Sequence, residues 1–183
     1  MKSVAVLMAN GCEEVEALTV VDVMRRAGVK CDMVSIGDIE VIGDHNIKII
    51  ADKRIDDGLD EYDLIVLPGG LKGTRNLQNS PKVIEAVKEF YKNKMVAAIC
   101  AAPVVLKTAG IVEGKNITSY PGFEAELKGC NYIDDENVVV DGNIITSRGP
   151  ATAMTFAYKL LEVLGNDKYK ELSKGMMYDF LKK

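Results

Sequence analysis

Cys100 lies in the stretch VAAICAAPVV (residues 96–105), where an apolar run meets Ala-Pro and further apolar residues. The pattern small-x-nucleophile-x-small at a strand-to-helix junction is typical of a nucleophile elbow, in which small neighbours relieve a crowded turn. The helix that follows would turn its positive end towards the sulfur and favour the thiolate. A buried, unreactive cysteine is the alternative, and this pattern alone leaves the two interpretations open.

Three carboxylates, Glu13, Glu14 and Glu16, stand at the start of a predicted helix. Acidic residues there complement the helix dipole, which is sufficient reason for all three. Glu16 differs from its neighbours because it lies four and seven residues before Val20 and Val23, and so shares their apolar, inward-facing stripe. A carboxyl held there would have a raised pKa and could donate a proton to a nearby thiolate.

Leu67-Pro68-Gly69-Gly70 follows another apolar run. Two glycines at the end of a strand let backbone N–H groups approach a ligand closely and bind negative charge. An ordinary tight turn uses the same residues, so Pro-Gly-Gly alone leaves both interpretations open.

A repeating pattern of strands and helices is predicted to bring these stretches together. Short apolar runs recur roughly 30 residues apart, the period of a βαβ unit, and they are continuous, as in strands buried on both faces. The expected strands are 4–8, 31–35, 64–67 and 96–99, with a hairpin at 138–146 and two short edge strands within 39–50; the expected helices are 17–28, one from Ser80 and one after Pro150. This pattern predicts one α/β domain over residues 1–183, a mainly parallel sheet with helices on both faces. Sites in such sheets form beyond the carboxyl ends of the strands.

Composition narrows the function classes. The 183 residues are 48% hydrophobic and 27% charged with a net charge of −4, which fits a globular protein and argues against nucleic acid as a partner. No apolar run is long enough for a membrane span, and the N-terminal one is too short for a signal peptide, so we expect a cytoplasmic protein with reduced thiols. The cysteines are far apart and predict neither a metal site nor a disulfide framework: Cys12, Cys31, Cys100 and Cys130.

The stretches GCEEVEA, VVDVMRRAG, LPGG, AAICAAP and TSRGP, in this order and spacing, resemble the ThiJ/PfpI superfamily. The resemblance is greatest to the branch of the parkinsonism-associated deglycase and its bacterial relatives, and it runs from Val4 to about Leu164. It implies a flavodoxin-like, three-layer sandwich and a homodimer. It also implies a set of site residues: Cys100 as nucleophile, Glu16 as its hydrogen-bonded acid, and Gly69, Gly70 and Ala101 as a backbone anion site.

Several positions depart from the superfamily pattern. Peptidase-like members carry a histidine directly after the nucleophile, where this chain has Ala101, and a related branch has one where this chain has Tyr120. The only histidine, His45, lies near a position that is often arginine in relatives, and we interpret it as an edge residue without a role. A Cys–His peptidase is therefore not expected. Tyr120 could orient a substrate oxygen, and Arg148 in the TSRGP loop either contacts substrate or lies exposed in a turn.

Two functions remain open. The first is cofactor-free conversion of 2-oxoaldehydes such as methylglyoxal, or of their early glycated adducts, in which Cys100 attacks the aldehyde carbon and Glu16 shuttles a proton. The second is an oxidative-stress sensor or chaperone in which Cys100 is oxidised to the sulfinate without small-molecule turnover. Both need the same thiol beside the same acid, so the sequence does not separate them.

Overall fold

The computed structural model describes residues 2–182, and its main sheet has seven strands. These are β1 (Ser3–Met8), β2 (Lys30–Ser35), β5 (Lys53–Arg54), β6 (Leu64–Leu67), β7 (Met95–Ile99), β10 (Val138–Asp141) and β11 (Ile144–Ser147). Their order is β10-β11-β7-β6-β1-β2-β5, and β10, which pairs antiparallel with β11, is the only antiparallel strand of this sheet. The mainly parallel sheet predicted from the sequence is confirmed.

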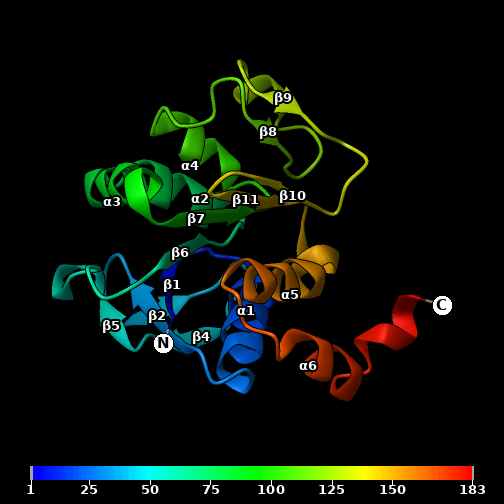
Figure 1. The fold of residues 1–183 in the computed structure, drawn as a ribbon. Coiled ribbons are helices and arrows are strands. Elements are labelled where there is room, and N and C mark those ends of the chain that lie inside the picture. Colours follow the sequence, from blue (N-terminus) through cyan, green and yellow to red (C-terminus); the bar gives the residue numbers. More distant parts are fainter. Residues whose placement is uncertain (1, 183) are drawn as a thin grey trace.

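Helices cover both faces of the sheet (Figure 1). They are α1 (Glu14–Arg26), α2 (Leu71–Gln78), α3 (Pro81–Asn93), α4 (Pro103–Thr108) and α5 (Ala153–Val163), whereas α6 (Tyr169–Gly175) packs against α5. Strand β1 shows why both faces are covered, since all six of its residues are buried. Val4, Val6 and Met8 pack in the core beneath α1 and α5, whereas Ala5 and Leu7 pack in the core beneath α2, α3 and α4.

Local sequence sets the ends of these helices. Ser80 caps α3, its hydroxyl accepting a hydrogen bond from the N–H of Val83 at 3.4 Å, and Pro81 occupies the first helical position.

None of the helices within residues 2–182 combines the length and the apolar character that crossing a membrane demands.

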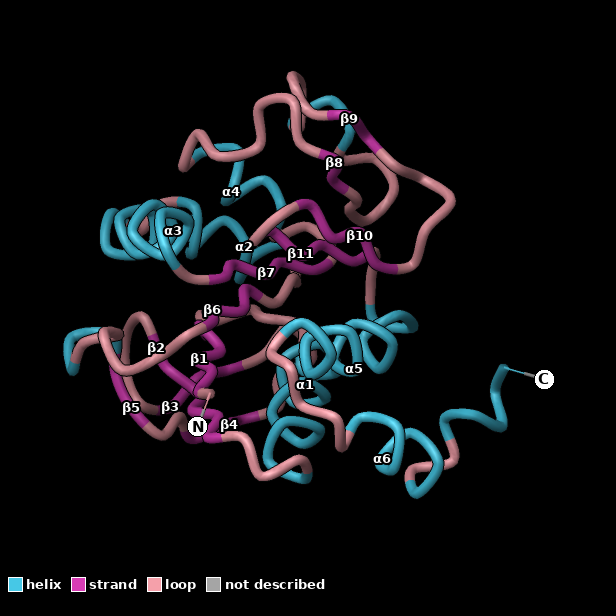
Figure 2. The backbone as a smooth tube through the Cα atoms, in the orientation of Figure 1, coloured by secondary structure: helices cyan, strands magenta, loops and turns pink. Residues whose placement is uncertain are grey.

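The segment 39–50 corrects one expectation. It does form two short strands, β3 (Glu40–Ile42) and β4 (Lys48–Ile50), but they pair only with each other and do not form an edge of the main sheet, where β5 lies instead. The hairpin is held by the loop before α1: the N–H of Gly11 donates to the carbonyl of Ile42 at 2.7 Å, and the N–H of Asp44 to that of Cys12 at 2.9 Å. A second small pair, β8 (Asn116–Ile117) and β9 (Asn131–Tyr132), is joined to β10 by a long loop (Figure 2).

Candidate active site

Cys100 follows β7 directly, at the carboxyl end of the sheet, and has a positive φ of 64°. A residue with a Cβ adopts this conformation rarely and at a cost, and such strain is concentrated at functional turns. Its N–H donates to the carbonyl of Ser147 at 3.0 Å and its carbonyl accepts from the N–H of Tyr120 at 2.9 Å, so neighbouring segments hold the turn. Ala101 is buried behind it, as an elbow requires. The sharp turn predicted at Cys100 is present, and the role of Cys100 as a nucleophile stays a prediction.

Glu16 lies beneath the sulfur on the inward face of α1 and is fully buried. One carboxyl oxygen, Oε2, accepts a hydrogen bond from the N–H of Gly69 at 2.7 Å. The other, Oε1, has no hydrogen-bond partner among residues 2–182, and the carboxyl lies close enough to the Cys100 thiol for each group to shift the pKa of the other. The inward direction predicted from the helical spacing is therefore confirmed.

Glu16, rather than Cys100, is the member of the pair that titrates near neutral pH. Burial raises the pKa of Glu16 to about 7, opposed in part by the N–H of Gly69. The pKa of the Cys100 thiol is also raised, first by burial and then by the negative charge of Glu16, while the backbone N–H groups of Ala101 and Gly70 lower it. Above about pH 7 the two groups together hold one proton and one negative charge, which a reaction can move between oxygen and sulfur.

The thiol pKa does not distinguish Cys100 from the other cysteines, because it is raised in all four. The helix that follows it, α4, has only six residues and begins at Pro103, so its dipole adds little at the sulfur. Burial raises the pKa of Cys12 and of Cys31 to about 12, and it raises that of Cys130 as well. The structure therefore does not support the predicted thiolate stabilised by a helix dipole. It indicates instead a protonated thiol beside Glu16, whose carboxylate can accept the thiol proton.

Of the two glycines after β6, Gly69 leaves room for Cys100 and Glu16, and Gly70 leaves room for the loop before α1. A Cβ on Gly69 would lie 2.6 Å from Cβ of Cys100, 2.6 Å from Oε2 of Glu16 and 3.0 Å from the sulfur. Gly70 has a φ of 82°, and a Cβ there would lie 2.3 Å from the carbonyl oxygen of Gly11. The N–H of Gly69 thus positions the carboxyl of Glu16, whereas the N–H groups of Gly70 and Ala101 lower the pKa of the Cys100 thiol.

Tyr120 donates its backbone N–H to Cys100, and Arg148 directly follows Ser147, which accepts from Cys100, but their side chains have different surroundings. Tyr120 is half exposed, and its ring packs against Gly149, where a Cβ would be 3.2 Å from the ring. The guanidinium of Arg148 donates to the carbonyl of Asp134 and lies 3.5 Å from the hydroxyl of Thr118, so it braces a neighbouring loop. A substrate contact by either residue stays a prediction.

Sequence reasoning missed the contacts of Glu14. This carboxylate is 4% exposed and accepts hydrogen bonds from the backbone N–H of His45 at 2.8 Å and, through Oε2, from Nδ1 of its ring at 2.9 Å. His45 is exposed, as expected, but it is not an edge residue without contacts. The burial of Glu14 could not be read from its position at a helix start.

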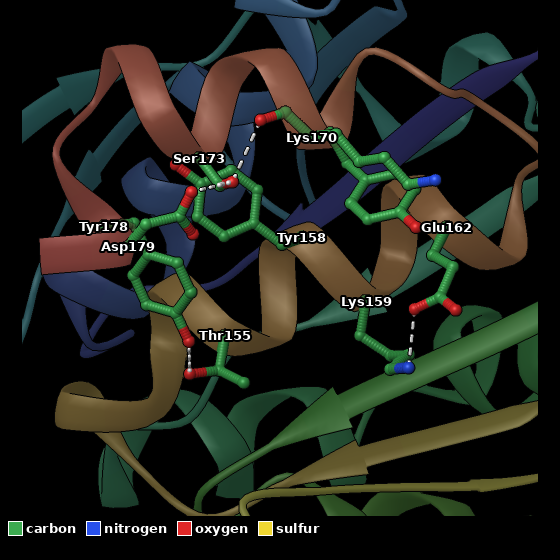
Figure 3. A pocket seen from close by; sticks show the side chains of 9 residues that line it. Thr155, Tyr158, Lys159, Glu162, Lys170, Ser173, Tyr178 and Asp179 are labelled. Atoms are coloured by element: carbon green, nitrogen blue, oxygen red, sulfur yellow. Dashed lines mark hydrogen bonds and ion pairs between the residues drawn. The ribbon is translucent and has the colours of Figure 1, made fainter. Parts of the chain in front are cut away.

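A hollow of about 440 Å³ lies on the far side of α5, between α5, α6 and the C-terminal turn (Figure 3). Its polar groups satisfy one another: Lys159 pairs with Glu162 at 2.6 Å, and the hydroxyl of Ser173 donates to Asp179 at 3.2 Å. Neither Cys100 nor Glu16 lines it. The hollow therefore adds nothing to the chemistry of the elbow.

Comparisons with known proteins show which family the chain resembles. The profile of the DJ-1/PfpI family matches residues 2–163. Protein dj-1beta of Drosophila melanogaster is 40% identical over 181 residues, which cover 96% of this chain and 97% of that protein. The glutathione-independent glyoxalase DJ-1 of Schizosaccharomyces pombe is 36% identical over 192 residues, which cover 96% of this chain and 98% of that protein.

Solved structures extend the similarity to the fold. The crystal structure of Drosophila melanogaster DJ-1beta superposes with a TM-score of 0.92, covering 96% of this chain and 97% of that one. The structure of Toxoplasma gondii DJ-1 in an oxidized form superposes with a TM-score of 0.88 at 32% identity, covering 97% and 98% of the two chains. The seven-stranded sandwich is thus the fold of these proteins.

Proposed function

The chain belongs to the DJ-1/PfpI family, and from this premise we propose that it converts 2-oxoaldehydes such as methylglyoxal to 2-hydroxy acids without a cofactor. The observation that carries the proposal is the buried carboxyl of Glu16, which has a pKa raised to about 7 and lies beside the thiol of Cys100. A general acid–base group works best when its pKa lies near the working pH. One relative, at 36% identity, is named a glutathione-independent glyoxalase.

The reaction begins with addition of the thiol to the aldehyde. The sulfur of Cys100 bonds to the aldehyde carbon, and ionised Glu16 takes the thiol proton and passes it to the new hydroxyl of the hemithioacetal. Glu16 then removes the hydrogen of that carbon as a proton, which gives an enediol, and returns it to the neighbouring carbon, while the hydroxyl proton of the first carbon moves to the oxygen of the second. The first carbon becomes a thioester carbonyl and the second becomes CHOH, so the substrate is oxidised at one carbon and reduced at the other. Water then cleaves the thioester, releasing the acid and the thiol.

The direct test is the incubation of purified protein with methylglyoxal in the absence of glutathione. We expect lactate to form in proportion to the methylglyoxal consumed, and no lactate above background from Cys100→Ala protein. Loss of methylglyoxal without lactate would mean only adduct formation on surface amines and thiols, and would contradict the proposal.

The pH dependence should report the ionisation of Glu16. Because its pKa is raised to about 7, the pair gains a second proton as the pH falls below 7, and the proton acceptor is lost. We expect kcat/KM to fall about tenfold per pH unit on the acid side of a midpoint near 7. A midpoint near the ordinary glutamate value of ~4.3 would contradict this assignment.

A sensor function is the second candidate, favoured by the surroundings of the sulfur. Cys100 is half buried, and the N–H groups of Gly70 and Ala101 stand beside it with the Glu16 carboxyl. These groups would stabilise a sulfinate by hydrogen bonds. Peroxide treatment followed by peptide mass mapping distinguishes the sensor from the enzyme. A sensor should gain two oxygen atoms on Cys100 at low peroxide concentration and should not turn over methylglyoxal.

The homodimer implied by the resemblance also has a candidate surface. The β3–β4 hairpin exposes Ile42 and Ile50 on one face and Ile47 at its tip, and Glu14 fastens this tip to the start of α1, where Val15 is 52% exposed. Clustered exposed apolar side chains are typical of protein interfaces. We propose that two copies of the chain meet through this surface.

Light scattering at micromolar concentration tests the dimer. The wild-type chain should have twice the monomer mass, and Ile47→Glu should shift it towards the monomer because a carboxylate would be buried in the interface. Val140→Glu is the matched control, since Val140 is also exposed but lies on β10. A monomeric wild type, or dissociation by the control alone, would contradict this surface.

A further inference from the structure

The segment that carries Tyr120 contacts Cys100 at its start and the core at its end. The N–H of Tyr120 donates to the carbonyl of Cys100 at 2.9 Å, and Leu127 is 1% exposed in the core beneath α2, α3 and α4. We name residues 120–127 the Tyr120 loop. We propose that Arg75 of α2 is a positioning residue, whose ion pair with Glu126 holds the Tyr120 loop beside Cys100 and so sets the access of substrate to the sulfur.

The geometry of the ion pair is that of a strong one. Nη1 of Arg75 donates to Oε2 of Glu126 at 2.7 Å, and Nη2 donates to Oε1 at 2.7 Å, so the contact is bidentate. Nη1 also donates to Gln78 at 2.8 Å, and the amide of Gln78 donates to Thr108 of α4 at 2.9 Å. Exposed ion pairs usually contribute little, but a bidentate arginine pair with fixed partners is the exception.

The Tyr120 loop has few other contacts that could hold it. The N–H groups of Gly122, Phe123, Glu126 and Leu127 all donate to acceptors within the loop itself. Six of its eight residues are exposed, and only Phe123 and Leu127 pack against the core. Within residues 2–182 the pair with Arg75 is the only salt bridge that this loop makes. A segment of this kind opens locally at low cost, so loss of the pair should loosen it.

Helix α2 connects the ion pair to the sulfur from the other side. The helix begins directly after Gly70, whose N–H lies beside the thiol of Cys100 and lowers its pKa. Arg75 lies in the second turn of the same helix, at Leu71 plus four. The ion pair therefore joins two segments that both contact Cys100, and fixes one relative to the other.

The ion pair should respond to salt. The hydrogen bonds from Arg75 hold the pKa of Glu126 below its usual range, so both groups are charged at neutral pH. Their side chains are 38% and 42% exposed, and mobile ions reach them. Because the Debye length falls from ~10 Å at 0.1 M to ~3 Å at 1 M, concentrated salt should weaken the hold on the loop.

Hydrogen exchange and thiol alkylation test the proposal. In Arg75→Gln and in Glu126→Gln, amides of residues 120–127 should exchange about 3–5-fold faster, and iodoacetamide should alkylate Cys100 faster by a similar factor. The exchanged pair Arg75→Glu/Glu126→Arg should restore both rates towards the wild type. Asp56→Asn is the matched control, because it breaks the exposed pair of Asp56 with Lys82, beyond the edge strand β5, and should change neither rate.

Salt and turnover give two further readouts. In 1 M NaCl the wild type should exchange and alkylate as fast as Glu126→Gln, whose rates should not respond. KM for methylglyoxal, which rests on the proposed function, should rise about 3–5-fold in both single variants with kcat unchanged, since neither residue moves a proton. Wild-type exchange in both variants, faster exchange without faster alkylation of Cys100, or an unchanged KM would overturn the proposal. Exchange and alkylation need no turnover, so a wild type that forms no lactate would count against the proposed function alone.

Discussion

Replacing Glu16 with Gln should lower kcat for methylglyoxal by about 10²–10⁴-fold while the protein stays folded, and Cys100→Ala should abolish turnover. The amide of Gln has nearly the shape of the carboxyl, so the pocket between α1 and the sulfur keeps its packing. It has no pKa near 7, however, and can neither take the thiol proton nor carry a proton between the two carbons. Lactate production under saturating substrate, with circular dichroism of each variant, measures this.

Tyr120→Phe is the matched control for Glu16→Gln. The ring at position 120 would still pack on Gly149, and only the hydroxyl, which we predict to orient substrate, would be lost. One such hydrogen bond is worth roughly 0.5–1.5 kcal/mol, so the loss should be about tenfold or less. Glu16→Gln protein with wild-type kcat would remove the proton shuttle from the mechanism. An inactive Tyr120→Phe would assign the proton transfer to the phenol instead.

Much of the site could be predicted because its signals are local. The small residues around Cys100 identify the elbow, and the spacing of Glu16 from Val20 and Val23 identifies an inward-facing carboxyl. Both follow from the periodicity of a strand or helix, which is a property of consecutive residues. The central strands were predicted for the same reason, because parallel strands buried on both faces are continuous apolar runs.

The features that the sequence did not predict depend on contacts between distant segments. The hydrogen bond from Gly69 to Glu16 joins residues 53 apart, and no pattern in the sequence near either residue predicts it. Likewise, the place of the β3–β4 hairpin depends on the loop before α1, so the sequence predicted its strands but not their separation from the main sheet. Helix α2 was missed because it is short, contains Gly73 and has no side-chain cap.

Gly69→Ala should damage the site almost as severely as loss of Glu16. The methyl group would lie 2.6 Å from both Cβ of Cys100 and Oε2 of Glu16, closer than carbon atoms in proteins approach. Either the strand end moves, which breaks the 2.7 Å hydrogen bond that positions the acid, or the carboxyl is displaced from the sulfur. Overpacking of this kind typically costs ~1–3 kcal/mol of stability. We therefore expect both a lower melting temperature and a fall in kcat of at least about 10²-fold.

Gly37→Ala is the matched control for that substitution, because a Cβ on Gly37 would meet no atom within 4 Å. Its melting temperature and kcat should equal those of the wild type. If Gly69→Ala is too unstable to assay at 25 °C, turnover is measured at a lower temperature at which its near-ultraviolet circular dichroism matches the wild type. Folded Gly69→Ala protein with wild-type kcat would show that proton transfer tolerates a displaced Glu16. The mechanism would then have to place the reacting proton on another group, since the Gly69 N–H is the only backbone donor that holds this carboxyl in residues 2–182.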